Sequence, residues 1–372
     1  MKSITYIVQS MTIPGGLERV LTDRLNALVL LGCYKLSVIC VSQTSDEKNY
    51  YKLSNKIEQY NLGYSFNPIT SFKSNPLRFI YERTVWEIKY NKECKRLLDI
   101  IKPDILVSTV FFVPSCFYWF KGKKVLESHG DRASMMSSRM FPLLSRFAER
   151  CANVVVTLTN EDKKAYTAAK RVEVIPNFTD IKPSEVAVVR RQSMVAVGRL
   201  CHQKGFDLLI DAWAKIAKKY PHWQLEIYGE GPDEQLLNNK IMTLGLSDKV
   251  FLRGAIKDIT AVYSTHSVLL FSSRYEGFGM VLIEAMVCGL PCVAFDCPCG
   301  PSDIIDNGVN GLLIELRGLT RELQVEKFAS GIEWMIQNPE KRELMGQLAK
   351  NKVDCFSKKI IIEKLINLYD NL

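Results

Sequence analysis

The chain has 372 residues, of which 47% are hydrophobic and 24% charged, close to the composition of ordinary folded proteins. This composition excludes a disordered or fibrous chain, and the length predicts two domains. The 11 cysteines are an odd number scattered along the chain, which argues against a disulfide framework and for a reducing compartment.

Charge is unevenly distributed along the sequence. The net charge is +9, and residues 1–190 hold 28 Lys and Arg against 18 Asp and Glu. This basic half predicts an anionic partner. Residues 73–102 mix cations with aromatic residues, which is typical of a helix on an anionic membrane surface. A solvated helix face and nucleic-acid binding are the alternatives for this segment.

No segment has the pattern of a membrane span or an export signal. The longest uncharged run, residues 105–120, is shorter than the roughly 20 residues that span a bilayer, and we expect a buried strand followed by a loop. The N-terminus has no small-residue cleavage site. We therefore expect a cytoplasmic protein, peripheral at the inner face of the cytoplasmic membrane.

Short apolar runs alternate with helical patterns along the chain, which predicts parallel βαβ units. In the first half, helical patterns are expected at 16–32 and 160–170, and strands at 4–10, 35–42, 104–109, 124–130 and 153–159. In the second half, helical patterns are expected at 206–220, 233–246 and 280–289, and strands at 194–200, 223–231, 249–255, 267–273 and 291–296.

These two series predict an α/β protein with two Rossmann-like, doubly wound parallel-sheet domains facing a central cleft. We expect an N-terminal acceptor-binding domain at 1–185, a C-terminal donor-binding domain at 186–355, and a helix at 356–372 that crosses back to the N-terminal domain. Ligands of such sheets bind outside the carboxyl ends of the strands.

The stretch "SSRYEGFGMVLIEAMVCG", residues 272–289, has the pattern of an anion site. A strand ends near residue 272, a loop with Gly277 and Gly279 follows, and a helix begins at Met280. Glycines let the backbone approach a ligand, and we expect free N–H groups at Met280, Val281 and Leu282.

Two glutamates in this stretch are eight positions apart. Glu276 lies in the loop, whereas Glu284 lies about one turn into an otherwise apolar helix. The helix dipole favours an acid there by about 0.3–1 kcal/mol. Burial of an unpaired carboxylate opposes folding by several times that amount, so a functional role is the better interpretation.

The segment "EGFGMVLIE" resembles the E-x7-E signature of retaining glycosyltransferases of family 4, which have the GT-B fold, and residues 274–313 are similar to such proteins of bacterial capsule and O-antigen assembly. Residues 195–213 resemble the segment that opens the family's second domain. The resemblance implies that Arg199 and Lys204 bind the two donor phosphates, Glu276 the sugar hydroxyls and Glu284 the ribose. It also assigns the backbone N–H groups of Phe278 to Val281 to the sugar.

Two sites in the first half also match the family. Gly15 and Gly16 follow a strand and open a helix, as the family's glycine loop does beside donor phosphate and acceptor; by itself the pair equally suits a tight turn. His129 lies just past a strand, with Asp131 beside it. A histidine there is often only a loop residue, but the resemblance implies contact with the donor sugar near its reacting face.

The sequence contains no D-x-D, so we expect no metal held by paired aspartates and no cofactor besides the UDP-sugar substrate. Arg199, Lys204 and a helix N-terminus would neutralise the leaving diphosphate instead. The spacing of Cys288, Cys292, Cys297 and Cys299 lacks the paired knuckles of a zinc site.

The resulting hypothesis is a retaining transfer of a hexose or N-acetylhexosamine from a UDP-sugar to a glycan acceptor, polyprenyl-diphosphate-linked or otherwise lipid-linked, in bacterial surface polysaccharide assembly. A UDP-N-acetylglucosamine 2-epimerase of the same fold is the main alternative. A nicotinamide dehydrogenase is disfavoured because Gly229 and Gly231 lack a third glycine. A non-catalytic binder of lipid or nucleic acid is a third class, and we expect no nucleic-acid partner.

Overall fold

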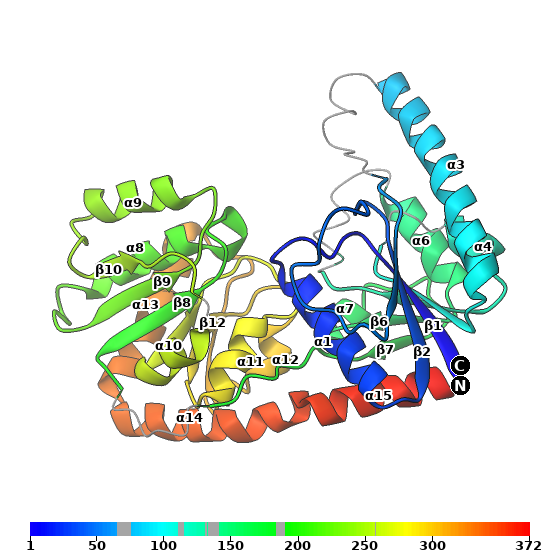
Figure 1. Ribbon diagram of the computed structural model, residues 1–372. Coiled ribbons are helices and arrows are strands. Elements are labelled where there is room, and N and C mark those ends of the chain that lie inside the picture. The colour runs from blue at the N-terminus through cyan, green and yellow to red at the C-terminus, as the bar shows by residue number, and fades with distance from the viewer. Residues whose placement is uncertain (65–75, 111–114, 131, 133–140, 184–189, 257) are drawn as a thin grey trace. The chain divides into compact units, whose positions relative to one another are not determined.

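The computed structural model describes residues 1–64, 76–110, 115–130, 132, 141–183, 190–256 and 258–372 (Figure 1). The chain divides into two compact units. Unit 1 comprises Met1–Leu158, Asp162–Ile175 and Ile362–Leu372, and unit 2 comprises Thr159–Glu161 and Pro176–Ile361. The boundary predicted between residues 185 and 186 lies outside the described residues.

Unit 1 contains a parallel seven-stranded sheet in the order β3-β2-β1-β4-β5-β6-β7. The strands are β1 (Lys2–Val8), β2 (Tyr34–Cys40), β3 (Glu58–Asn61), β4 (Ile105–Ser108), β5 (Lys123–Glu127), β6 (Val154–Thr157) and β7 (Val172–Val174). The helices are α1 (Gly16–Leu30), α3 (Pro76–Ile101), α4 (Ser115–Trp119), α6 (Phe141–Cys151), α7 (Asn160–Lys163) and α15 (Lys358–Asp370), and the first residues of α7 and α15 belong to unit 2.

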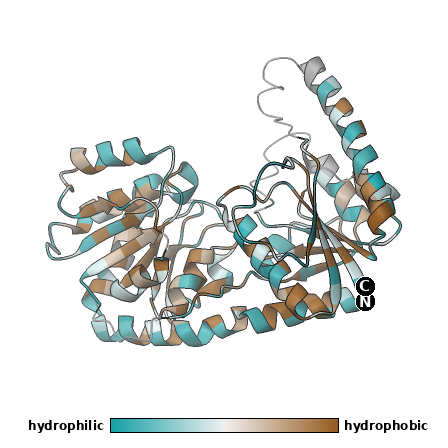
Figure 2. Cartoon of the chain, viewed as in Figure 1, coloured by the Kyte–Doolittle hydropathy of each residue, from teal (hydrophilic) through white to brown (hydrophobic). Residues whose placement is uncertain are grey.

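The central strands of unit 1 are apolar because helices cover both faces of the sheet. Ile7, Leu106 and Leu126, from β1, β4 and β5, pack in one core with Tyr90 and Leu98 of α3. Figure 2 shows these strands as mostly hydrophobic, whereas α3 carries hydrophilic residues as well. The apolar runs of the sequence therefore formed the predicted parallel strands.

Unit 2 contains a parallel six-stranded sheet in the order β10-β9-β8-β11-β12-β13. The strands are β8 (Ser193–Val197), β9 (Gln224–Tyr228), β10 (Val250–Leu252), β11 (Val268–Phe271), β12 (Cys292–Phe295) and β13 (Gly311–Ile314). The helices are η1 (His202–Lys204), α8 (Phe206–Ile216), α9 (Glu234–Thr243), α10 (Ile259–Thr265), α11 (Met280–Val287), α12 (Pro301–Ile304), α13 (Arg321–Gln337), α14 (Pro339–Val353) and η2 (Asp354–Phe356).

Two local predictions differ from the structure. Residues 115–119 form helix α4 where we expected a loop, because Cys116 and Phe117 are buried and turn toward the core. The helical pattern at 160–170 yields only the four-residue α7. The helix does not continue, because the next N–H groups bond three residues back, from Ala165 N to Asp162 O and from Tyr166 N to Lys163 O. The Tyr166 side chain is buried there.

In both sheets the strand order reverses beside the first strand. β1 lies between β2 and β4, and β8 lies between β9 and β11. Open α/β sheets bind ligands outside the carboxyl ends of the strands at such a reversal. The loops after β8 and β11 leave from adjacent strands of unit 2, and so they define a candidate site. Within the described ranges, no helix combines the length and apolar character needed to cross a bilayer.

Candidate functional site

Lys204 and Glu276 form an ion pair in unit 2. Lys204 Nζ lies 2.6 Å from Glu276 Oε1, and the Ser273 hydroxyl donates to the same oxygen at 2.7 Å. The Glu276 side chain is 9% exposed and the Lys204 side chain 19%, so water screens the pair only partly. The structure thus brings together a cation and a carboxylate from the loops after two neighbouring strands.

The backbone holds these two loops against each other. Gly205 has a φ of 63°, and a Cβ added there would overlap the Ser272 carbonyl oxygen, so both conformation and space require glycine. The Ser272 hydroxyl donates to the Lys204 carbonyl at 2.8 Å. These contacts fix the backbone of Lys204 beside the end of β11.

Arg274 anchors the loop after β11 to the start of α8. Its guanidinium donates to both carboxylate oxygens of Asp207 at 2.8 Å and to the His202 carbonyl at 2.7 Å. Burial acts to raise the pKa of Asp207, but hydrogen bonds from Arg274 and Arg321 outweigh it and hold that pKa well below its usual range. The Asp207 carboxylate therefore stays ionised and holds the loop.

Helix α11 begins at Met280 as predicted, after Gly279 with a φ of 99°. The Leu282 N–H donates to the Gly279 carbonyl at 2.9 Å. The prediction of three free N–H groups is therefore wrong for Leu282, because this hydrogen bond, which spans three residues, closes the first turn. Gly277 and Phe278 precede the helix, and the Phe278 ring is buried edge-on against Phe356.

Arg199 lies in the loop after β8, and its side chain is exposed. Among the residues that the structure describes, its guanidinium makes no hydrogen bond or ion pair. The neighbouring Gly198 packs on the stem of Lys204, where an added Cβ would lie 3.2 Å from Lys204 Cδ. Arg199 is therefore an exposed cation that directly follows the glycine packed on Lys204.

Glu284 is buried on α11, with 4% of its surface exposed. The Tyr263 hydroxyl donates to Glu284 Oε2 at 3.5 Å. The structure thus shows the buried carboxylate that the sequence indicates. Its role with ribose stays a prediction.

In unit 1, Gly15 caps helix α1 and Gly16 is its first residue. The Glu18 carboxylate folds back to the place where a Cβ of Gly15 would lie, whereas nothing lies within 4 Å of that position at Gly16. A carboxylate at a helix N-terminus competes with a phosphate for the same N–H groups. The sequence prediction did not include this acid.

His129 follows β5, also in unit 1, and its side chain is 8% exposed. Its Nε2 lies 3.2 Å from Glu127 Oε2, and its Nδ1 is buried with no hydrogen-bond partner among the described residues. Burial lowers the pKa of His129, against the opposing effect of Glu127. The imidazole is therefore neutral at neutral pH. Asp131 lies outside the described residues.

Sequence reasoning missed several residues of these sites. Ser273 and Arg274 lie within the quoted motif, where two polar residues at the end of an apolar strand were an available signal. Glu127 was also detectable as a charged residue at a strand end. Arg24 and Tyr369, which contact Glu127, have no local signal because they lie 103 and 242 positions from it.

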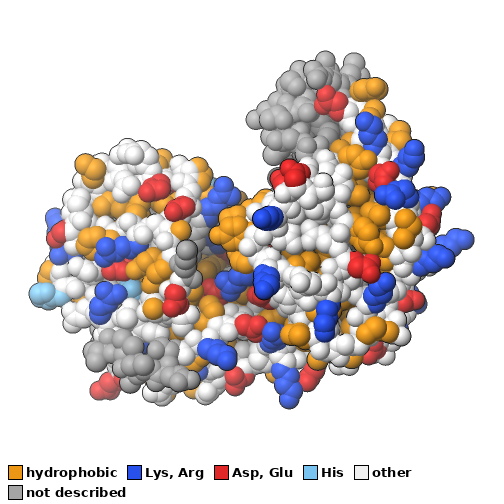
Figure 3. Space-filling model, viewed as in Figure 1, with side chains coloured by type: hydrophobic (Ala, Val, Ile, Leu, Met, Phe, Trp, Pro, Cys, Tyr) orange, Lys and Arg blue, Asp and Glu red, His pale blue; other side chains and the backbone are white. Residues whose placement is uncertain are grey.

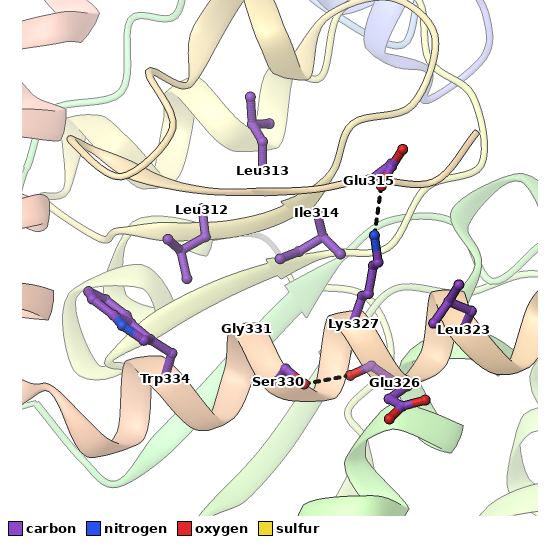
Figure 4. Close-up of a pocket in the computed structure, with 10 residues that line it drawn as sticks. All are labelled: Leu312, Leu313, Ile314, Glu315, Leu323, Glu326, Lys327, Ser330, Gly331 and Trp334. Carbon is purple, nitrogen blue, oxygen red and sulfur yellow. Dashed lines mark hydrogen bonds and ion pairs between the residues drawn. The ribbon is translucent and has the colours of Figure 1, made fainter. Parts of the chain in front are cut away.

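A separate pocket lies between β13 and α13 (Figure 4). Leu312, Ile314 and Trp334 line it, and Lys327 pairs with Glu315 at its rim at 2.6 Å. It contains none of the predicted site residues. Across the described ranges, no group of three or more His, Cys, Asp or Glu side chains is arranged to hold a metal ion.

Comparison with known proteins shows what unit 2 is similar to. Residues 177–352 match the family of glycosyl transferases group 1. The chain is 28% identical to an uncharacterized glycosyltransferase of Haemophilus influenzae over 98% of both chains. It is 31% identical to the amylovoran biosynthesis glycosyltransferase AmsD of Erwinia amylovora over 59% of this chain and 63% of that one. Residues 177–352 are therefore similar to glycosyl transferases group 1.

Solved structures agree on the fold. The crystal structure of a Staphylococcus aureus TarM mutant in complex with Fondaparinux, alpha-GlcNAc-glycerol and UDP has a TM-score of 0.77, covers 99% of this chain and 100% of that one, and is 17% identical in sequence. Its likeness shows that the two parallel-sheet units have the GT-B fold, as predicted. Family 4 membership and the function of the E-x7-E spacing stay predictions.

Proposed function

We propose that the chain is a retaining glycosyltransferase of polysaccharide biosynthesis, which transfers a hexose or N-acetylhexosamine from a UDP-sugar to a glycan hydroxyl. The observation that carries the proposal is the Lys204–Glu276 pair at the strand-order reversal of the matched domain. Amylovoran biosynthesis in the AmsD name and UDP in the TarM complex support the pathway and the donor.

In the proposed reaction, the glycosidic bond of the donor breaks and the positive charges at this site stabilise the leaving diphosphate. The bond from the anomeric carbon to the diphosphate breaks, and its electron pair leaves with UDP. The acceptor oxygen forms the new bond on the same face, and its proton passes to a leaving phosphate oxygen. Arg199 and Lys204 stabilise the negative charge that develops on the diphosphate, and the partial burial of Lys204 strengthens its effect.

Glu276 orients the donor sugar in this proposal. Its Oε1 accepts bonds from Lys204 and Ser273, which hold the carboxylate in one orientation before the donor binds. A carboxylate with fixed geometry accepts bonds from sugar hydroxyls and places the anomeric carbon against the acceptor. Because the two cations neutralise the diphosphate, the proposed reaction requires no metal or cofactor.

The acceptor is proposed to be lipid-linked, presented at the inner face of the cytoplasmic membrane. On α3, Tyr81 and Ile88 are 70% and 63% exposed, and Lys92 and Lys95 continue the same face at helical spacing. Figure 3 shows hydrophobic and basic side chains together on this part of unit 1. Such a face suits anionic lipid. Sedimentation with anionic and neutral vesicles tests this contact, and equal binding to both would contradict it.

The direct test is release of free nucleoside diphosphate from a panel of UDP- and GDP-sugars, with and without EDTA and with candidate glycan acceptors. We expect release from a UDP-sugar that survives EDTA and falls at least about 100-fold in Glu276→Gln and Lys204→Met. Lys327→Met is the matched control, since Lys327 belongs to an exposed pair of the same length.

The outcomes separate the proposal from the epimerase alternative. A free epimerised sugar in place of a glycosylated acceptor would identify an epimerase. Loss of activity with EDTA, restored by a divalent metal, would contradict metal-independent transfer. Absence of both release and nucleotide-sugar binding would overturn the glycosyltransferase proposal itself.

A further inference from the structure

Three successive carbonyls of η1 accept hydrogen bonds from the loop after β11, all within unit 2. Arg274 donates twice, from its guanidinium to the His202 carbonyl at 2.7 Å and from its backbone N–H to the Gln203 carbonyl at 2.8 Å. The Ser272 hydroxyl donates to the Lys204 carbonyl at 2.8 Å. These bonds hold the two loops side by side along their backbones, next to the ion pair of the candidate site.

The side chain of Gln203 bonds back to the same loop. Its Nε2 donates to the Tyr275 carbonyl at 3.0 Å. Gln203 directly precedes Lys204, and Tyr275 directly precedes Glu276. A carbonyl oxygen only accepts, so the amide nitrogen must face it, and an ionised glutamate in this place would have no proton to donate. The contact therefore depends on an amide side chain.

The Tyr275 carbonyl belongs to the peptide group that leads into Glu276. The N–H of this peptide group, on Glu276, donates to the Pro298 carbonyl at 3.3 Å. Pro298 lies in the loop after β12, whereas Gln203 lies in the loop after β8, so two other loops hold the two ends of one peptide group. A peptide group is planar, and bonds at both its ends therefore restrict the direction in which the Glu276 side chain leaves the backbone.

The side chains that bond to Glu276 do not fix this direction by themselves. Lys204 ends in a compact ammonium with three rotatable donors on a flexible stem, so it can follow the carboxylate if the loop moves. The Ser273 hydroxyl, which also donates to Glu276 Oε1, rotates to suit its acceptor. A peptide group that is bonded at both ends lacks this freedom. The orientation of Glu276 therefore depends on the backbone contacts as well as on the ion pair.

We propose that Gln203 is a positioning residue, which holds the peptide group between Tyr275 and Glu276 so that the Glu276 carboxylate meets the donor sugar in one orientation. The contact stands on the geometry of unit 2, whereas its use in donor recognition rests on the proposed function. Gln203 carries no charge and acts through Glu276. It should therefore affect binding of the sugar more than binding of the diphosphate, which Arg199 and Lys204 neutralise in the proposed reaction.

Hydrogen exchange of the full chain, followed by NMR, tests the contact without any ligand. Gln203→Met keeps the size of the side chain but removes its donor, and we expect exchange of the Glu276 N–H to quicken by about tenfold. Gln235→Met is the matched control, because Gln235 Nε2 donates to Asn239 Oδ1 at 2.9 Å, a bond of similar length within α9. Unchanged exchange at Glu276 in Gln203→Met, or equal acceleration in the control, would overturn the proposal.

Calorimetric titration with UDP, UDP-glucose and UDP-N-acetylglucosamine then tests the use of the contact. Gln203→Met should lower the affinity for the UDP-sugar that wild type binds more tightly by about fivefold, and the affinity for UDP by less than about twofold. Equal losses for UDP and the UDP-sugar, or no loss for either, would overturn the positioning role. If wild type binds none of the three, the proposed function fails, while hydrogen exchange still decides whether Gln203 holds the peptide group before Glu276.

Discussion

Lys204 Nζ donates to Glu276 Oε1 at 2.6 Å, although the two residues are 72 positions apart in the sequence. Their loops follow β8 and β11, which are adjacent in the sheet because the strand order reverses there. The pair therefore preorganises the candidate donor site before any ligand binds, and it also contributes to the stability of unit 2.

Replacement of Lys204 by Met should therefore lower both activity and stability. The change leaves Glu276 buried with Ser273 as its remaining donor, and we expect the free energy of unfolding to fall by about 2–4 kcal/mol. Urea unfolding measures the change. Lys327→Met breaks an exposed pair of equal length and should change the free energy by less than about 1 kcal/mol. Equal losses in the two variants would contradict a special role for burial.

Gly205→Ala should destabilise unit 2 more than Gly245→Ala does. Both glycines have nearly the same positive φ, 63° and 65°, but only at Gly205 does an added Cβ overlap another atom, the Ser272 carbonyl oxygen. Backbone strain alone predicts a loss of about 1 kcal/mol at either site, and the overlap should add at least as much at Gly205. Thermal unfolding compares them, and nucleotide-sugar affinity should fall only in Gly205→Ala.

Asp207→Asn should loosen the loop that carries Glu276. The substitution removes the charge that Arg274 and Arg321 both bind, and we expect a loss of about 1–2 kcal/mol together with a raised KM for the donor. Donor titration and urea unfolding measure the two effects. Asp248→Asn, at an exposed pair with Lys249, should leave both unchanged. A normal KM in Asp207→Asn would show that the Arg274 anchor is not needed for donor binding.

His129 should make stability depend on pH near neutrality. Its pKa in the folded chain lies below the ordinary histidine value of about 6.5, because burial disfavours the charged ring. Between these two pKa values the unfolded chain binds a proton that the folded chain does not. The free energy of unfolding therefore falls as pH decreases below about 6.5.

The contribution of His129 is isolated by the difference between wild type and His129→Gln. Urea unfolding from pH 8 to pH 5 should show wild type losing more stability than the variant across this range. Parallel curves for the two proteins would show that the pKa of His129 is not lowered by folding. The pKa of Glu127 is also lowered, so Glu127 changes the free energy of unfolding only below about pH 4.5, outside the range in which His129 acts.

Local sequence determined most elements of this protein and the outline of the loop after β11. Apolar runs of strand length predicted the parallel strands, and the glycines before Met280 predicted the start of α11, because these features depend on neighbouring residues alone. The same reasoning overestimated α7 and missed α4, where burial of Tyr166 and Phe117 decided the backbone. Local propensity is weak compared with such packing.

Tertiary structure alone decided which charges meet. Nothing near Glu276 in the sequence indicates Lys204 as its partner, and nothing near Glu127 indicates Arg24 or Tyr369. The free energy of a buried charge depends on donors that the fold brings within about 3 Å, at any distance along the chain. The sequence therefore determined where the loops and helices lie, and the fold decided the ionisation and orientation of the groups they carry.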